Sequence, residues 1–234
     1  MNIQHLTEVF EFEAKLLDTT LRQHPQLRPL FSRNFRSVDT SALKQAYLQL
    51  LKVKADYVQH TVPALQAAGL ALRDGDDEDR HWSELFLEYS AGEIDEQGDY
   101  GHHIWARDDM KALGASPDLW DAPPHASAVL YGKFFVDDVS QHPYAILGAK
   151  GVLEHFSIRV SDDVVRGIIE SGITNAKNAV KFFRHHGLLD IDHVRDGDRN
   201  LAKLEHAKKR FQILEGAYFT SGIYRSLIHY ALPT

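Results

Sequence analysis

The segment FFRHHGLLDIDH contains three side chains that could bind one metal ion together. His186, Asp190 and His193 follow one another at spacings of four and three residues. At about 100° per residue on an α-helix, they lie within roughly 60° of one another on one face. Two imidazoles and one carboxylate are a ligand set for non-haem Fe(II). The same spacing also fits an exposed polar stripe, because His and Asp are mostly surface residues.

Two other segments could complete such a site. In IDEQGDYGHH, Glu96 and His103 are seven residues apart, so they share a face if the segment is helical. Gly98 and Gly101 fit either a bend that brings both side chains to one point or an exposed loop. Glu154 lies within the apolar segment GAKGVLEHFSI, where a carboxylate must be paired with a basic group, protonated or bound to a metal.

Together these positions offer three carboxylates and three imidazoles from three separate segments. This supply is close to twice the two-histidine, one-carboxylate set of non-haem iron sites, and it matches the mixed ligands of di-iron sites in helical bundles. The chain has no cysteine, which excludes thiolate ligands, disulfides and cysteine nucleophiles. Any metal must therefore be bound by carboxylates and by some of the 14 histidines of the sequence.

Helical periodicity runs through the whole chain and predicts the elements that must position these residues. No segment shows the alternation of apolar and polar residues that is typical of strands. We therefore expect an all-α bundle of about seven to nine helices, in one domain over residues 1–234. The helices are expected at about 3–22, from 40 or 41 toward Pro63, 64–68, from 78 past 89, 125–139, 143–158, 162–171, 175–194 and 200–230.

The charge balance and hydropathy of the chain exclude several classes of partner. With 33 acidic and 26 basic residues, the net charge is −7, which disfavours nucleic acids and anionic membranes. No apolar segment is long enough to span a membrane, and the first residues lack a basic, signal-like region, so we expect a cytoplasmic protein. Phe211, Leu214, Ala217 and Tyr218 form an apolar stripe that either closes the bundle or forms a homodimer contact.

The order and spacing of the ligand candidates resemble those of the haem-oxygenase-like di-iron oxidases and oxygenases. That group includes the chlamydial death-domain-associating protein and enzymes that make terminal alkenes, nitro groups or nitriles from fatty acids or amino acids. The resemblance implies a haem-oxygenase-like (TenA/THI-4-like) fold and an O2-dependent oxidation of a small fatty-acid-like or amino-acid-like substrate by two iron ions. It also implies that the iron ligands are Glu96, His103, Glu154, His186, Asp190 and His193.

Two doubled histidines leave the register of this assignment open. Adjacent helical residues differ by about 100°, so only one residue of the pair 102 and 103, and one of the pair 185 and 186, can face the metals. The spacing to Asp190 and His193 favours His186, whereas His103 follows from the resemblance. Glu93, three residues before Glu96, is a further carboxylate candidate. For the substrate pocket, we select as lining candidates Tyr57, His60 and Phe156.

Several other functions fit a helical bundle of this size. Thiaminase II of the TenA/THI-4 group usually requires a cysteine, and the related quinone synthase would leave the clustered carboxylates and imidazoles without a purpose. Haem oxygenase needs a proximal histidine on the first helix, for which His5 and His24 have no supporting context. A ferritin-like site needs two Glu-x-x-His motifs, and only Glu78 and His81 form a plausible one. A helical interaction domain without catalysis is the remaining alternative.

Overall fold

The computed structural model describes residues 3–36, 38–94 and 101–232, and in this part of the chain every regular element is helical. The predicted all-α class is therefore confirmed. The α-helices are α1 (Ile3–Gln23), α2 (Arg28–Ser32), α3 (Thr40–Val58), α4 (Thr61–Leu72), α5 (Asp77–Gly92), α6 (His103–Ala112), α7 (Pro117–Trp120), α8 (Ala126–Gly132), α9 (Ala145–Glu170), α10 (Lys181–Leu201) and α11 (Ala207–Ala231). A π-helical turn (Lys133–Asp137) and two 3-10 turns (Val139–Gln141 and Ala176–Asn178) connect some of them.

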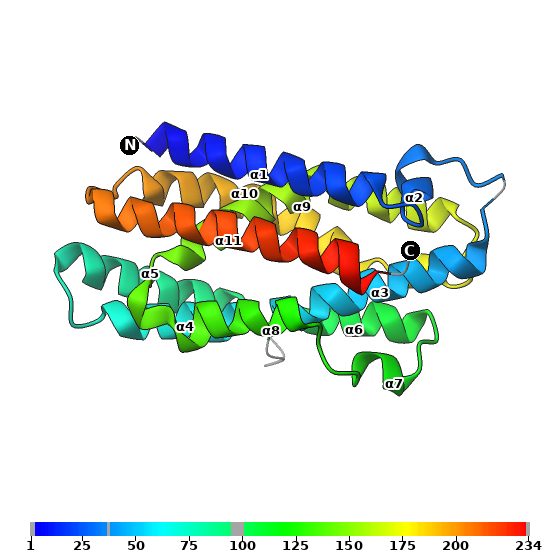
Figure 1. Cartoon of the computed structure of the whole chain (residues 1–234), viewed down its shortest axis with the longest axis horizontal. Coiled ribbons are helices and arrows are strands. Elements are labelled where there is room, and N and C mark those ends of the chain that lie inside the picture. Colours follow the sequence, from blue (N-terminus) through cyan, green and yellow to red (C-terminus); the bar gives the residue numbers. More distant parts are fainter. Residues whose placement is uncertain (1–2, 37, 95–100, 233–234) are drawn as a thin grey trace.

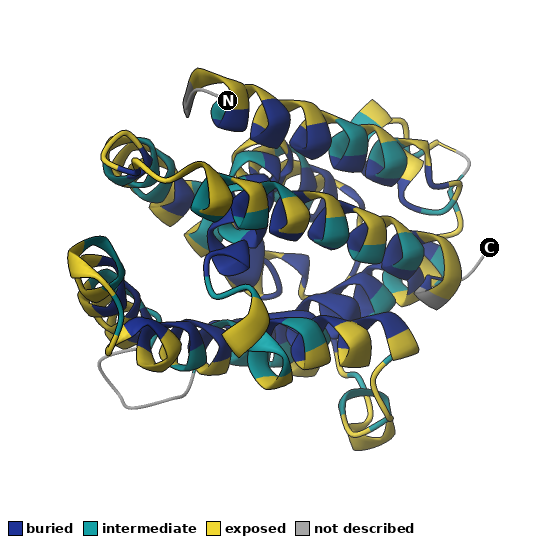
Figure 2. Ribbon diagram, turned by 60° about the vertical axis from the view of Figure 1, so that its left-hand side comes forward, coloured by how far each residue is buried: buried dark blue, intermediate teal, exposed yellow. Residues whose placement is uncertain are grey.

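The longest described helix, α9, is at the centre of the bundle. It packs along α1, α10 and α11, which form one side of the molecule, while α4, α5 and α8 lie on the other side (Figure 1). The helices turn their buried faces toward the interior and their exposed faces to solvent (Figure 2). A Cβ atom at Gly148 would overlap the carbonyl oxygen of Ile213, and one at Gly216 would overlap that of Ala145. These two glycines therefore allow α9 and α11 to cross in backbone contact.

Helix α3 brings a long apolar face to the core. Its N-cap is Asp39, whose side chain accepts hydrogen bonds from the amides of Ser41 and Ala42 at 2.8 and 3.1 Å. The helix therefore begins at Thr40, one of the two expected starting residues. Helix α4 begins at Thr61, earlier than the predicted start at residue 64. Pro63 is compatible with this start, because the first turn of a helix has no acceptor for the amide hydrogen that proline lacks.

Two predicted helix breaks are wrong. Residues 143–158 and 162–171 were expected as two helices, whereas α9 runs unbroken from Ala145 to Glu170. The apolar face of this helix continues across the predicted break, with Val160 and Val164 fully buried. Asp163 on the same helix pairs with Arg22 of α1 at 2.8 Å. Likewise, α10 continues past residue 194, where a helix end was expected, to Leu201. Asp198 in this continuation accepts a hydrogen bond from Thr7 of α1 at 3.2 Å.

None of the helices in the described part of the chain combines the length and the apolar character needed to cross a membrane.

Candidate metal centre

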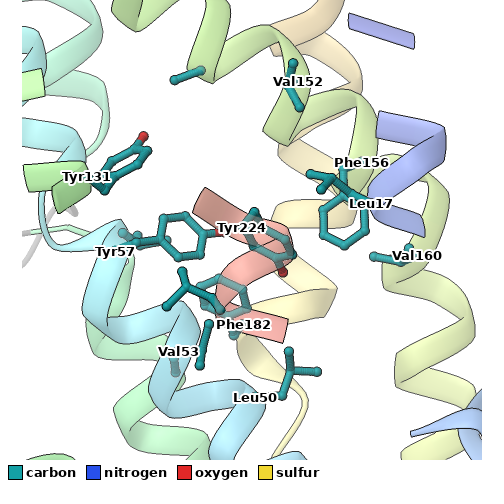
Figure 3. Packing of buried hydrophobic residues seen from close by; sticks show 14 of the residues in the cluster. Leu17, Leu50, Val53, Tyr57, Tyr131, Val152, Phe156, Val160, Phe182 and Tyr224 are labelled. Atoms are coloured by element: carbon teal, nitrogen blue, oxygen red, sulfur yellow. The ribbon is translucent and has the colours of Figure 1, made fainter. Parts of the chain in front are cut away.

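A cavity of about 80 Å³ lies in the core, and several acidic and imidazole side chains line it. Glu93 comes from the end of α5, His102 precedes α6, Glu154 is on α9, and His186 and Asp190 are on α10. The rest of the lining is largely apolar and aromatic. Figure 3 shows three of these aromatic side chains, Tyr57, Tyr131 and Phe182. A cavity of this size has room for metal ions and a few solvent molecules, since one water needs roughly 10–15 Å³ on this measure.

Three ligand atoms from α9 and α10 converge at one side of this cavity. Nδ1 of His193 is 3.4 Å from Oε1 of Glu154 and 3.4 Å from Oδ1 of Asp190. The potential ligand atoms of the three residues all lie within 4.8 Å of one another, which is close enough for a single cation. Gly187 makes this approach possible, because a Cβ atom there would be 2.7 Å from Cβ of Ser161 on α9.

A second group of three residues lies beside the first. Nδ1 of His102 is 3.2 Å from Oε2 of Glu93, and the rings of His102 and His186 have their centroids 5.0 Å apart. Nδ1 of His186 donates to the carbonyl oxygen of Phe182 at 3.0 Å, which leaves Nε2 with its lone pair for a metal. The ring of His102 is held by stacking on Trp105, with centroids 4.0 Å apart and planes 10° apart.

The charges of these groups depend on one another. Burial alone would raise the pKa of Glu154, but hydrogen bonds and charge attraction from Lys150 and His193 lower it. Burial raises the pKa of Asp190. Hydrogen bonds to Asp190 and Glu154 raise the pKa of His193 to about 9, whereas burial and the neighbouring imidazoles lower that of His186 to about 3. His186 is therefore a neutral ligand, and His193 and Lys150 balance the buried carboxylates.

The structure brings together most, but not all, of the predicted ligands. Glu154, His186 and Asp190 line the cavity, and His193 contacts two of them. His103 does not line it: its ring lies near Gly101, and its Nδ1 is buried without a hydrogen-bond partner in the described structure.

His102 lines the cavity in place of His103. The two side chains point in different directions because α6 begins at residue 103 and adjacent residues on a helix are about 100° apart. Glu96 lies outside the described residues, and the carboxylate that the structure places beside His102 is that of Glu93.

The predicted substrate residues are also separated by the structure. Tyr57 lines the cavity. His60 packs against α8, where a Cβ atom at Gly132 would be 2.6 Å from its ring, and it is not part of the lining. Phe156 packs edge-on against Tyr224, with centroids 5.1 Å apart, and also lies outside the lining.

Two lysines of the site were missed by the sequence analysis. Lys150 lies one helical turn before Glu154, and this spacing indicates an ion pair. Lys54 interrupts the apolar face of α3 and lines the cavity. A lysine on an otherwise apolar helix face is visible in the sequence, and it could have indicated Lys54 as a residue of the site.

The donor set suits iron. Carboxylates and imidazoles are hard and intermediate ligands of the kind that non-haem iron sites use. Five of them line the cavity, and His193 contacts two of these five. Glu154, Asp190 and His193 lie close enough together to hold one ion, and Glu93, His102 and His186 are the candidates for a second.

Comparisons with known proteins identify the fold and the family of the chain. A solved domain of unknown function with a haem-oxygenase-like fold, from Shewanella denitrificans OS217, matches with a TM-score of 0.72 and 13% identity, covering 97% of this chain and 91% of that chain. A CADD-like protein of unknown function from Nostoc punctiforme PCC 73102 matches with a TM-score of 0.48 and 16% identity, covering 96% of this chain and 99% of that chain. A search of curated proteins finds no match. The sequence profile of the iron-containing redox enzyme family matches residues 42–221, and this chain, with its haem-oxygenase-like fold, belongs to that family.

Proposed function

We propose that the protein is a non-haem di-iron enzyme that uses O2 to oxidise a small organic substrate, either fatty-acid-like or amino-acid-like. The observation that carries this proposal is a set of carboxylate and imidazole donors in and beside one buried cavity, three of which, Glu154, Asp190 and His193, converge closely enough to hold one ion. When bound, a pair of iron ions would supply the reduction of O2 and the oxidising power. The family assignment supports iron redox chemistry at this coarse level.

The chain itself contributes ligand orientation and a dry site. The hydrogen bond from His186 to the carbonyl of Phe182 fixes which ring nitrogen is free, and the stacking of His102 on Trp105 fixes its ring plane. The apolar walls exclude bulk water, which strengthens electrostatic interactions in the cavity and limits side reactions. Tyr57 lines the same space and is placed to contact a bound substrate.

Iron binding tests the proposal directly. After anaerobic loading with Fe(II) and removal of loosely held metal, we expect two iron ions per chain by metal analysis. His102→Gln should lose one of them, and Glu154→Ala should lose at least one. His103→Gln is the matched control, because the adjacent ring lies outside the cavity lining, and this variant should keep both. Wild-type protein that retains only trace iron would refute the di-iron function and favour a metal-independent TenA-like or quinone-synthase-like protein, or a non-catalytic interaction domain.

We also propose that the protein forms a homodimer through the outer face of α11. Phe211 and Tyr218 are 66% and 52% exposed on this face, whereas Ala217 is buried against the bundle. Exposed aromatic side chains are common at protein interfaces. Light scattering should give twice the mass of one chain, and Phe211→Glu should lower it to the mass of one. A wild-type monomer at high concentration would refute the dimer.

A further inference from the structure

Lys54 is a buried cation that has no anionic partner among the described residues. Its exposure is 4%, and it lines the cavity beside the metal ligands. No carboxylate in the described structure lies within ion-pair distance of its Nζ, and the contact to the Tyr57 hydroxyl is long, at 3.4 Å. The two other buried or nearly buried lysines nearby are paired: Lys52 with Asp56 at 2.6 Å, and Lys150 with Glu154. An unpaired buried ammonium is costly, so this position calls for a ligand.

Aromatic rings surround this ammonium and compensate for only part of that cost. Nζ of Lys54 is 4.6 Å from the ring centroid of Tyr224, 4.8 Å from that of Phe156 and 5.5 Å from that of Phe183. Figure 3 shows the rings of Tyr57 and Tyr224 close together, with centroids 5.6 Å apart. The hydroxyl of Tyr224 is itself buried without a hydrogen-bond partner in the described residues. The Tyr224 hydroxyl therefore lacks an acceptor, and the ammonium of Lys54 has only the long contact to Tyr57.

We propose that Lys54 binds the carboxylate of the substrate and selects a monocarboxylate that carries no ammonium group. An ammonium can donate two or three hydrogen bonds to an anion, and a carboxylate is a small organic anion that fits beside apolar walls. The same cavity is also lined by Val58, Leu65, Ile146 and Leu153, which suit a hydrocarbon chain. This inference rests on the proposed function in one respect. Glu93, Glu154 and Asp190 are assigned to the metals, which leaves no carboxylate among the described residues of the cavity lining to pair with a substrate ammonium.

Binding of hexanoate to the metal-free chain, measured by calorimetry at neutral pH, tests the inference without iron or turnover. We expect Lys54→Met and Lys54→Gln to weaken hexanoate binding at least tenfold, while both variants keep the helical circular dichroism of the wild type. Lys52→Met is the matched control, because Lys52 is also buried on α3 but does not line the cavity; it should bind hexanoate like the wild type. Hexanamide, which has no negative charge, should bind equally to the wild type and to Lys54→Met. Norleucine adds an ammonium group to the six-carbon acid and should bind more weakly than hexanoate.

The inference is overturned if Lys54→Met binds hexanoate as the wild type does, if norleucine binds as tightly as hexanoate, or if hexanoate binds neither the metal-free nor the Zn(II)-loaded chain. The failure of the proposed function would look different. In that case the chain would retain no iron, yet hexanoate binding would still depend on Lys54. Conversely, two bound iron ions without any dependence of hexanoate binding on Lys54 would leave the di-iron function standing and remove only the anchoring role.

Discussion

Replacing Lys54 with methionine should make the metal-free protein more stable. Methionine has nearly the same length and removes only the charged end, so the packing among the aromatic rings is kept. Burial lowers the pKa of Lys54 from 10.5 to about 7, against an opposing attraction from Asp190. A shift of this size corresponds to about 5 kcal/mol of unfavourable free energy when the lysine is protonated in the folded state, at roughly 1.4 kcal/mol per pKa unit.

The sign of the effect gives it a distinctive pH dependence. Because the folded-state pKa is lowered, the destabilisation is complete below about pH 7, decreases as pH rises, and is gone above the unfolded-state pKa of 10.5. Urea unfolding of both proteins at pH 6 and pH 9.5 measures it, since titrations common to both cancel in the difference. We expect the advantage of Lys54→Met to shrink by about 3 kcal/mol between these pH values. A variant less stable than the wild type at pH 6, or an advantage independent of pH, would show that Lys54 is not a strained buried cation.

Three further outcomes follow from the site and the bundle. Lys150→Met should raise the affinity for Fe(II) or Co(II) about tenfold by calorimetry, because it removes an ammonium that is bonded to Glu154, a proposed ligand; unchanged affinity would contradict this competition. The pKa of His193 is raised to about 9, so its stabilising contacts are complete below about pH 6.5 and lost as pH rises through 9. The stability difference between the wild type and His193→Gln, measured by urea unfolding, should therefore decrease over that range, and a constant difference would argue against the contacts. Gly148→Ala should lower the unfolding free energy by about 2–3 kcal/mol, because the new methyl group overlaps a carbonyl of α11; a melting temperature equal to that of the wild type would contradict the close crossing.

Much of the fold could be predicted because it depends on local periodicity. The first helix was expected over about 3–22 and is observed over Ile3–Gln23. The ligand candidates on α10 could likewise be selected from spacing alone, since their convergence on one face is a property of a single helix. The predicted break after residue 158 was wrong because the buried face of α9 continues across it through Val160 and Val164, which pack into the core.

The choice between the two histidines of the pair at 102 and 103 could not be made from the sequence. It depends on where α6 begins and on how the preceding segment enters it, neither of which follows from a periodic pattern. Once α6 starts at residue 103, stacking on Trp105 turns His102 toward His186. Lys54 was more accessible to prediction. It falls on the same face of α3 as Leu50, Leu51 and Tyr57, where a charged residue requires a chemical reason.

The ion pairs of Lys150 and His193 with Glu154 bear on how the protein is made. Many small metal-binding domains unfold without their metal because the free energy of metal binding supplies much of their folding free energy. Here the acidic ligands already have cationic neighbours within the chain, so a newly synthesised molecule in an iron-starved cell can still reach its native shape. Iron would then bind to a chain that is already folded. Its binding would displace the Lys150 ammonium from Glu154 and a proton from His193.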